Sequence, residues 1–229
     1  MKGISLAVIL LFSCFNSICQ DILTEDSRIY GRDPLLFNGD KYTYYVPSGT
    51  EGNQFLAGKQ FSPGTIKFNG AVFQVSRINY DIYNQQVVLE YSNEAGASNF
   101  IKLSQAWLES FQIGDQYFEL SALPDGSSKI YQVLAAGNIR ILFYLYKTLS
   151  LDMGTGSRNY VFSSPKKNCY LQMKNQYVEY KSNKSFLSAF QEEEQLSIRK
   201  FMKSHHLNVK KASDRSLTEL LNYCAAMEK

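Results

Sequence analysis

Four carboxylates in the strand-like part of the chain are of the type that glycoside hydrolysis requires. These are Asp81, Glu90, Asp115 and Glu119. A glycosidase needs two carboxyl groups roughly 5–9 Å apart, and spacing along the sequence does not establish such a pair. Carboxylates on a solvated surface are the competing interpretation, and no catalytic motif accompanies them. The sequence therefore favours a non-enzymatic protein, with a periplasmic hydrolase of glycan or peptide as an alternative.

Thiols and imidazoles are the other side chains that could do chemistry. The pair His205-His206 is a weak metal site, because neighbours on a helix point about 100° apart. Cys169 and Cys224 could act as nucleophiles, but both fall on apolar stripes, where buried thiols are inert. In an exported chain the two could instead form a disulfide. The pattern predicts core thiols or a Cys169–Cys224 disulfide, and it indicates no metal or cofactor.

Tyrosine offers a better functional signal, with 16 copies beside 15 Phe and one Trp. Its ring is apolar and its hydroxyl polar, which suits protein interfaces and sugar or peptide surfaces. Tyr131, Tyr144 and Tyr146 fall on one predicted strand face together with Arg140, and we predict a binding surface there. Arg140 interrupts an apolar strand and should pair with a carboxylate or hold an anion. Ordinary strand packing is the competing interpretation of these tyrosines.

Short strands and turns fill residues 28 to 180, and the clearest unit is a hairpin at Asn69-Gly70. Asn-Gly favours a type I′ turn, because both central residues need positive φ. The alternation places Phe68 opposite Ala71 and Ile66 opposite Phe73. One face of this hairpin is apolar and the other polar, which predicts a sheet with one buried side.

Two further hairpins are expected. Gly137-Asn138 joins Lys129–Ala136 to Ile139–Leu149, and both faces of this pair are apolar. We therefore expect the pair to be central or covered on both sides. A third turn at Lys174-Asn175 would bring the following residues back beside the strand that carries Cys169.

The apolar period changes to a helical one after Lys181. The first stripe comprises Leu187, Phe190, Ile198 and Phe201, and the second comprises Leu217, Leu220, Leu221 and Cys224. The second helix should start near Ser216, with Glu219 completing a capping box. The chain is therefore predicted to be mainly β and α+β overall. An antiparallel sandwich or open barrel at 20–181 would precede two C-terminal α-helices at 182–229, packed on the β domain.

Residues 1–19 have the form of an export signal. Lys2 gives a positive start, Ile4 to Phe15 form an apolar run, and small residues precede a cut between Cys19 and Gln20. The mature chain is expected to begin at Gln20 and to work in the periplasm or at the cell surface.

A lipid anchor is the alternative for this leader. Leu11-Phe12-Ser13-Cys14 partly matches a lipoprotein cleavage box, which would make the chain an outer-membrane lipoprotein anchored at Cys14. No later apolar stretch approaches the roughly 20 residues of a transmembrane helix. The net charge of +3 does not indicate the concentrated basic surface of a nucleic-acid-binding protein. The expected partner is an envelope protein or polymer.

The chain also resembles a group of exported proteins of Bacteroidetes-type bacteria that have no known activity. The residues that carry the likeness are Phe61–Ile66, Arg77–Asn84, Val87–Tyr91, Ile198–Lys203 and Leu217–Tyr223. The resemblance implies export and a β-rich body with a helical end. It implies no cofactor and no catalytic residue.

These features together favour an exported envelope protein that acts as a binding or structural module through an aromatic sheet face. The alternatives are the hydrolase described above and a carrier that holds a lipid or other apolar ligand inside an open barrel.

Overall fold

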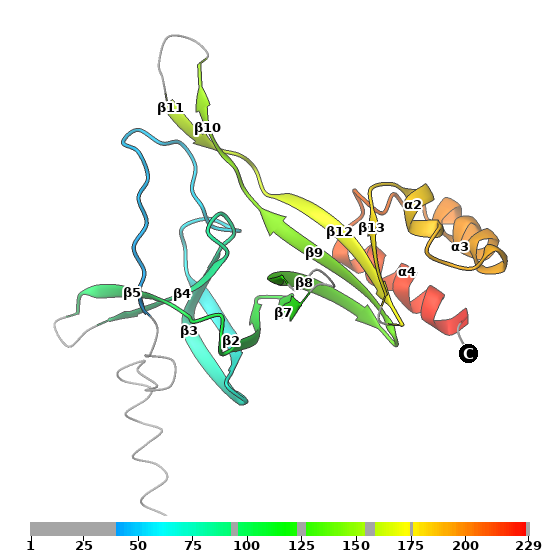
Figure 1. Ribbon diagram of the computed structural model, residues 1–229, viewed down its shortest axis with the longest axis horizontal. Helices are drawn as coiled ribbons and strands as arrows, with labels where there is room; N and C mark the ends of the chain where they lie inside the picture. The colour runs from blue at the N-terminus through cyan, green and yellow to red at the C-terminus, as the bar shows by residue number, and fades with distance from the viewer. Residues whose placement is uncertain (1–39, 93–95, 123–126, 154–158, 175, 228–229) are drawn as a thin grey trace, which may run out of the picture.

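The computed structural model describes residues 40–92, 96–122, 127–153, 159–174 and 176–227. The expected leader at 1–19, with Cys14, lies outside these residues. Eleven of the strands in the described part form one antiparallel sheet, in the order β1-β5-β4-β3-β2-β6-β7-β8-β9-β12-β13. Strands β10 and β11 form a separate hairpin, which extends away from the main sheet in Figure 1.

The strands are β1 (Asp40–Lys41), β2 (Ser62–Phe68), β3 (Ala71–Asp81), β4 (Gln86–Ser92), β5 (Ser98–Lys102), β6 (Leu108–Ile113), β7 (Gln116–Ala122), β8 (Ser128–Ala136), β9 (Ile139–Tyr146), β10 (Leu149–Asp152), β11 (Asn159–Phe162), β12 (Lys166–Met173) and β13 (Gln176–Tyr180). The helices are α2 (Asn183–Leu187), α3 (Glu192–Ser204) and α4 (Asp214–Met227). The predicted class, mainly antiparallel β with helices at the C-terminus, is confirmed. Among the described strands, β1 and β13 are the two ends of the main sheet, which does not close into a barrel.

The hairpin at Asn69-Gly70 has the predicted register. Phe68 pairs with Ala71 and Ile66 with Phe73. Asn69 and Gly70 have φ of 49° and 77°, as a type I′ turn requires. Ile66 and Phe68 are buried in the core, so the predicted one-sided burial is also correct.

The second predicted hairpin joins β8 to β9, with Ala136 opposite Ile139. Both of its faces are largely covered, and the pair lies inside the sheet between β7 and β12. Strand β9 ends at Tyr146 rather than at Leu149, because Leu149 begins β10 and pairs with Phe162. The third hairpin joins β12 to β13 with Met173 opposite Gln176, and Asn175 of its turn lies outside the described residues.

The sheet curves where β2 lies between β3 and β6. Its pairing shifts register between Ser62 and Gly64 on one side and between Lys67 and Phe68 on the other, and such irregularities bend a strand. Neighbouring chains approach closely at Gly64, where an added Cβ would lie 2.3 Å from the carbonyl oxygen of Gln112. This position therefore has no room for a side chain, and only glycine fits.

The helices start where their capping residues dictate. The first apolar stripe forms two helices instead of one, because Gln191 caps α3 and its N–H donates to the Glu194 carboxylate at 3.0 Å. The acidic run that follows Gln191 therefore marks a helix start, where the helix dipole favours negative charge. Helix α4 starts at Asp214, two residues before the predicted position. Its cap is Ser213, whose hydroxyl accepts from the Ser216 N–H at 3.2 Å.

The expected capping role of Glu219 is therefore wrong. Its carboxylate instead accepts a 3.3 Å hydrogen bond from Arg215, one turn earlier on the exposed face of α4. The predicted apolar stripe of α4 is correct, since Leu217, Leu220 and Leu221 are fully buried.

Helix α4 lies against β8 and β9, α2 contacts β13, and α3 packs on α4. Figure 1 shows the three helices gathered at one end of the molecule. No helix in the described part of the chain has the length and apolar character to cross a membrane.

Candidate functional site

The predicted tyrosines gather on the side of β8, β9, β12 and β13 that faces away from the main core. We call this surface the tyrosine face, and it consists of Tyr131, Tyr144, Tyr146, Tyr170 and Tyr177. Alternation along the strands places the rings on one side, and they surround a small apolar cluster formed by Tyr131, Val133 and Leu142. The predicted grouping of Tyr131, Tyr144 and Tyr146 with Arg140 therefore agrees with strand geometry.

Tyr131 supports this surface from below. It is fully buried, and its ring centroid lies 6.1 Å from that of Tyr144 and 5.9 Å from that of Tyr170. The Tyr170 ring meets it edge-to-face and the Tyr144 ring is tilted against it, and aromatic pairs at these separations are favourable. Tyr131 is thus a packing residue, which corrects its expected role as a direct contact for a partner.

Tyr144 and Tyr146 are partly exposed and lie where a partner could reach them. Their rings stack with centroids 5.9 Å apart, and the ammonium of Lys129 lies 5.2 Å from the centre of the Tyr144 ring. Burial, with smaller effects from Tyr170 and Tyr146, raises the pKa of Tyr144 above its ordinary value. This hydroxyl therefore stays protonated at neutral pH and can donate as well as accept a hydrogen bond.

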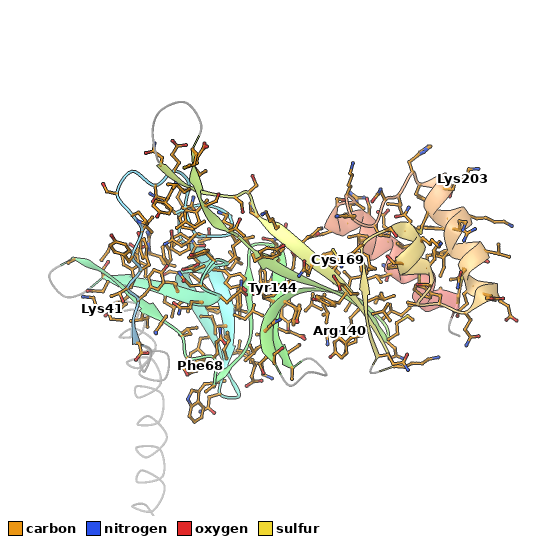
Figure 2. All side chains as sticks on the ribbon, turned by 45° about the horizontal axis from the view of Figure 1, so that its top comes forward. Lys41, Phe68, Arg140, Tyr144, Cys169 and Lys203 are labelled. Atoms are coloured by element: carbon orange, nitrogen blue, oxygen red, sulfur yellow. The ribbon has the colours of Figure 1, made fainter. Side chains whose placement is uncertain are left out.

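Arg140 has the carboxylate partner that its position in an apolar strand led us to expect. Its guanidinium forms an ion pair with Glu119 on β7 and donates to the side-chain oxygen of Gln172 at 3.3 Å. The Gln172 amide in turn donates to the Tyr177 hydroxyl at 3.0 Å. Both charged side chains are about one-quarter exposed, so the pair is open to solvent but held in place. Figure 2 shows Tyr144 near the middle of the molecule and Arg140 closer to the helices.

A second group of aromatic side chains surrounds a pocket of about 160 Å³, which we call the aromatic pocket. Its lining includes Tyr44, Tyr45, Tyr83 and Phe162. The three tyrosines are among the 16 of the sequence, but no sequence pattern indicates that they meet. No sequence pattern indicates that Phe162 joins them, because it lies on β11, far along the chain from the three tyrosines.

The four carboxylates are separately placed. Asp81 is buried and hydrogen-bonded at the end of β3. Glu90 and Glu119 each form an ion pair with an arginine, and Asp115 lies in the turn between β6 and β7. Asp81, Glu90 and Glu119 are thus each held by structural partners. This arrangement lends no support to a catalytic pair.

Cys169 and Cys224 are both buried, and no disulfide joins these two residues of the described chain. The two residues lie on different elements of the same core. Cys169 on β12 pairs with Phe143 and Tyr180, whereas Cys224 is on α4, which lies over β8 and β9. The disulfide offered by the sequence is therefore not formed in this structure. Burial raises the pKa of the Cys169 thiol, which disfavours the reactive thiolate.

The histidine pair ends helix α3. The His205 ring stacks on Phe201 with centroids 4.1 Å apart, and His206 takes a left-handed conformation with φ of 51°. Within the described residues, no group of three or more His, Cys, Asp or Glu side chains is arranged to hold a metal ion.

Comparison with known proteins gives no relative: no family model, no curated protein and no solved structure matches the chain. The resemblance to exported proteins of Bacteroidetes-type bacteria therefore stays a prediction.

Proposed function

We propose that this protein is an exported, non-enzymatic binding module of the cell envelope that holds its partner on the tyrosine face. The observation that carries this proposal is a set of partly exposed tyrosine rings fixed in place over the buried ring of Tyr131. The partner is an envelope protein or polymer, met in the periplasm or at the cell surface.

The chemistry of the surface supports such a role. Tyrosine gives a large contact area at low entropic cost, because its ring has few rotatable bonds. Here the rings of Tyr144 and Tyr146 also hold each other by stacking, so less freedom is lost on binding. The Arg140–Glu119 pair adds donors and acceptors without a net charge. A partner with a flat surface of mixed polarity would be complementary.

Photo-crosslinking in cells tests this proposal. A photoreactive amino acid in place of Tyr146 should yield a defined crosslinked product. The matched control carries the same group in place of Leu196, an exposed apolar residue on α3. Absence of a product from position 146, or the same products from both positions, would contradict the proposal.

Truncation of the rings provides the complementary measurement. The double variant Tyr144→Ala, Tyr146→Ala should bind the captured partner at least about tenfold more weakly, because central aromatic residues dominate interface energies. Circular dichroism must show that the variant is folded. Unchanged affinity in the folded variant would exclude the tyrosine face as the binding surface.

The mass of the exported protein tests its location. Soluble export predicts a chain that begins at Gln20, and a lipid anchor predicts a chain that begins at Cys14 with added acyl mass. A full-length chain that starts at Met1 and stays in the cytoplasm would contradict export altogether.

A further inference from the structure

The aromatic pocket has features of a binding site that are separate from those of the tyrosine face. The Tyr45 side chain is 90% exposed, that of Tyr44 52% and that of Tyr83 42%. The Tyr83 ring packs edge-on against Phe162, with centroids 5.3 Å apart. Exposed apolar surface that gathers around a hollow and is rimmed by polar groups often marks a ligand-binding groove. The aromatic pocket shares no lining residue with the tyrosine face.

Hydrogen bonds to Asp81 hold the turn that supplies Tyr83 and Asn84 to the pocket. Asp81 is fully buried and accepts hydrogen bonds from the backbone N–H of Tyr83 at 3.0 Å and from that of Asn84 at 2.8 Å. It also accepts from the Asn84 side-chain amide at 2.8 Å and from the Tyr42 hydroxyl at 2.6 Å. These bonds fix the turn between β3 and β4 and hold the Asn84 side chain in one orientation. This side of the pocket is therefore held in place before a ligand arrives, which lowers the cost of binding.

The described residues that line the aromatic pocket are aromatic, apolar or polar, and none of them is charged. Besides aromatic rings, the described residues around the aromatic pocket include the amides of Gln54, Asn84 and Gln86. A primary amide both donates and accepts hydrogen bonds, and the Asn84 amide, with one N–H engaged by Asp81, retains a second N–H and its oxygen. A lining of this kind discriminates against charged ligands, because no side chain of opposite charge compensates their desolvation.

A second pocket, of about 410 Å³, continues from the first. Asn84 and Gln86 line both pockets, and Ser104 and Gln105 line only the second. Lys102 and Asp40 also line the second pocket, and they form an ion pair with each other at 3.4 Å that adds no net charge. The combined groove is aromatic at one end, carries amide groups where the two pockets meet, and contains the Lys102–Asp40 pair at the other end. Two adjoining pockets with amides between them suit a ligand made of more than one polar unit.

We infer that this groove binds a neutral oligosaccharide, with one sugar ring packed on the exposed tyrosines and the next units hydrogen-bonded along Asn84 and Gln86. A neutral sugar presents C–H groups on one ring face and hydroxyls around its edge. The C–H groups pack on an aromatic ring, and the hydroxyls exchange hydrogen bonds with amides. A lipid tail would leave these amides unpaired, which costs free energy.

Isothermal titration calorimetry on the purified full-length chain tests this inference. The probes are soluble hexasaccharides of β-1,4-linked glucose, α-1,4-linked glucose and β-1,4-linked N-acetylglucosamine, together with polygalacturonate as a charged glycan. At least one neutral probe should bind, and polygalacturonate should bind much more weakly. Absence of binding by all neutral probes, or tighter binding of polygalacturonate, would overturn the inference.

Two matched substitutions locate the site. Tyr83→Ala should weaken binding of the neutral probe by about tenfold or more, because it removes one wall of the pocket. Tyr117→Ala is the control, since the Tyr117 side chain is 40% exposed and lies outside both pockets. Tyr83→Phe keeps the ring and should retain most of the affinity. Equal effects of Tyr83→Ala and Tyr117→Ala in folded protein would overturn the placement of the ligand in this groove.

Discussion

The hydroxyl of Tyr42 donates a 2.6 Å hydrogen bond to Oδ2 of Asp81, and both residues are buried although 39 positions separate them. This bond ties the irregular segment after β1 to the end of β3. The Gln54 amide donates to the same hydroxyl at 3.1 Å. Nearby, the Lys147 ammonium donates to the backbone carbonyls of Asn53 and Phe55. The irregular segment is thus held by buried polar groups that pair with one another.

Replacing Tyr42 with Phe should therefore destabilise the fold. The change removes a donor from a buried carboxylate, and a hydrogen bond to a charged group contributes about 1.5–3 kcal/mol. We expect a loss of that size in the free energy of unfolding, measured by urea denaturation. Tyr44→Phe is the control, because Tyr44 is half exposed and should change stability by less than about 0.5 kcal/mol. Equal stability of Tyr42→Phe and the unsubstituted protein would show that Asp81 does not depend on this donor.

Alkaline pH should unfold the protein through its buried phenols. Burial, with the hydrogen bond to Asp81, raises the pKa of Tyr42 well above its ordinary value, and burial likewise raises the pKa of Tyr80 and of Tyr180. In the unfolded chain these groups ionise near pH ~10. Their contribution to stability is therefore complete below about pH 10 and is lost as the pH rises above it.

A spectrophotometric titration of tyrosinate checks this pH dependence. The exposed tyrosines, such as Tyr45, should ionise first while the circular dichroism of the native state persists. The buried tyrosines Tyr42, Tyr80 and Tyr180 should ionise only when the protein unfolds. If all 16 tyrosines ionised in one step near their ordinary pKa in folded protein, the prediction would fail.

Local signals explain which parts of the fold are predictable from sequence. The turn at Asn69-Gly70 needs only the φ preferences of two adjacent residues, and the alternation around it then fixes the pairing of Ile66 with Phe73. The apolar stripe of α4 is equally local, since its residues recur every three or four positions. The first residue of a helix is harder to predict from sequence. Several nearby serines, such as Ser213 and Ser216, could each serve as the N-cap.

The aromatic pocket could not be predicted in the same way. Tyr44 comes from an irregular segment without period, Tyr83 from a turn and Phe162 from the end of β11. Only the folded sheet brings them together. Strand order could not be predicted for the same reason. Strand β2 pairs with β6 as well as with β3, and no local pattern identifies such a distant partner.

Gly64→Ala should be strongly destabilising. An added Cβ would lie 2.3 Å from the Gln112 carbonyl oxygen and 2.7 Å from the Ile78 side chain, so β2 would have to move from both neighbouring strands. We expect a loss of roughly 3 kcal/mol in the free energy of unfolding, typical of overpacking in a closely packed region. Thermal denaturation measures it.

Gly70→Ala separates this effect of space from an effect of backbone conformation. Gly70 has φ of 77° and nothing within 4 Å of the added Cβ, so only conformational strain of about 1 kcal/mol should appear. Equal losses for the two substitutions would mean that the close approach at Gly64 relaxes without cost.

The two thiols should be inaccessible in the folded protein and separate from each other. In a chain that begins at Gln20 the cysteines are Cys169 and Cys224, and both are buried. Because burial raises the pKa of Cys169 and shields both sulfurs, a thiol reagent should label neither under native conditions. In denaturant without reductant it should label both, which mass spectrometry counts directly. Two labels in denaturant agree with the structure, whereas no label there would mean that a disulfide joins the pair.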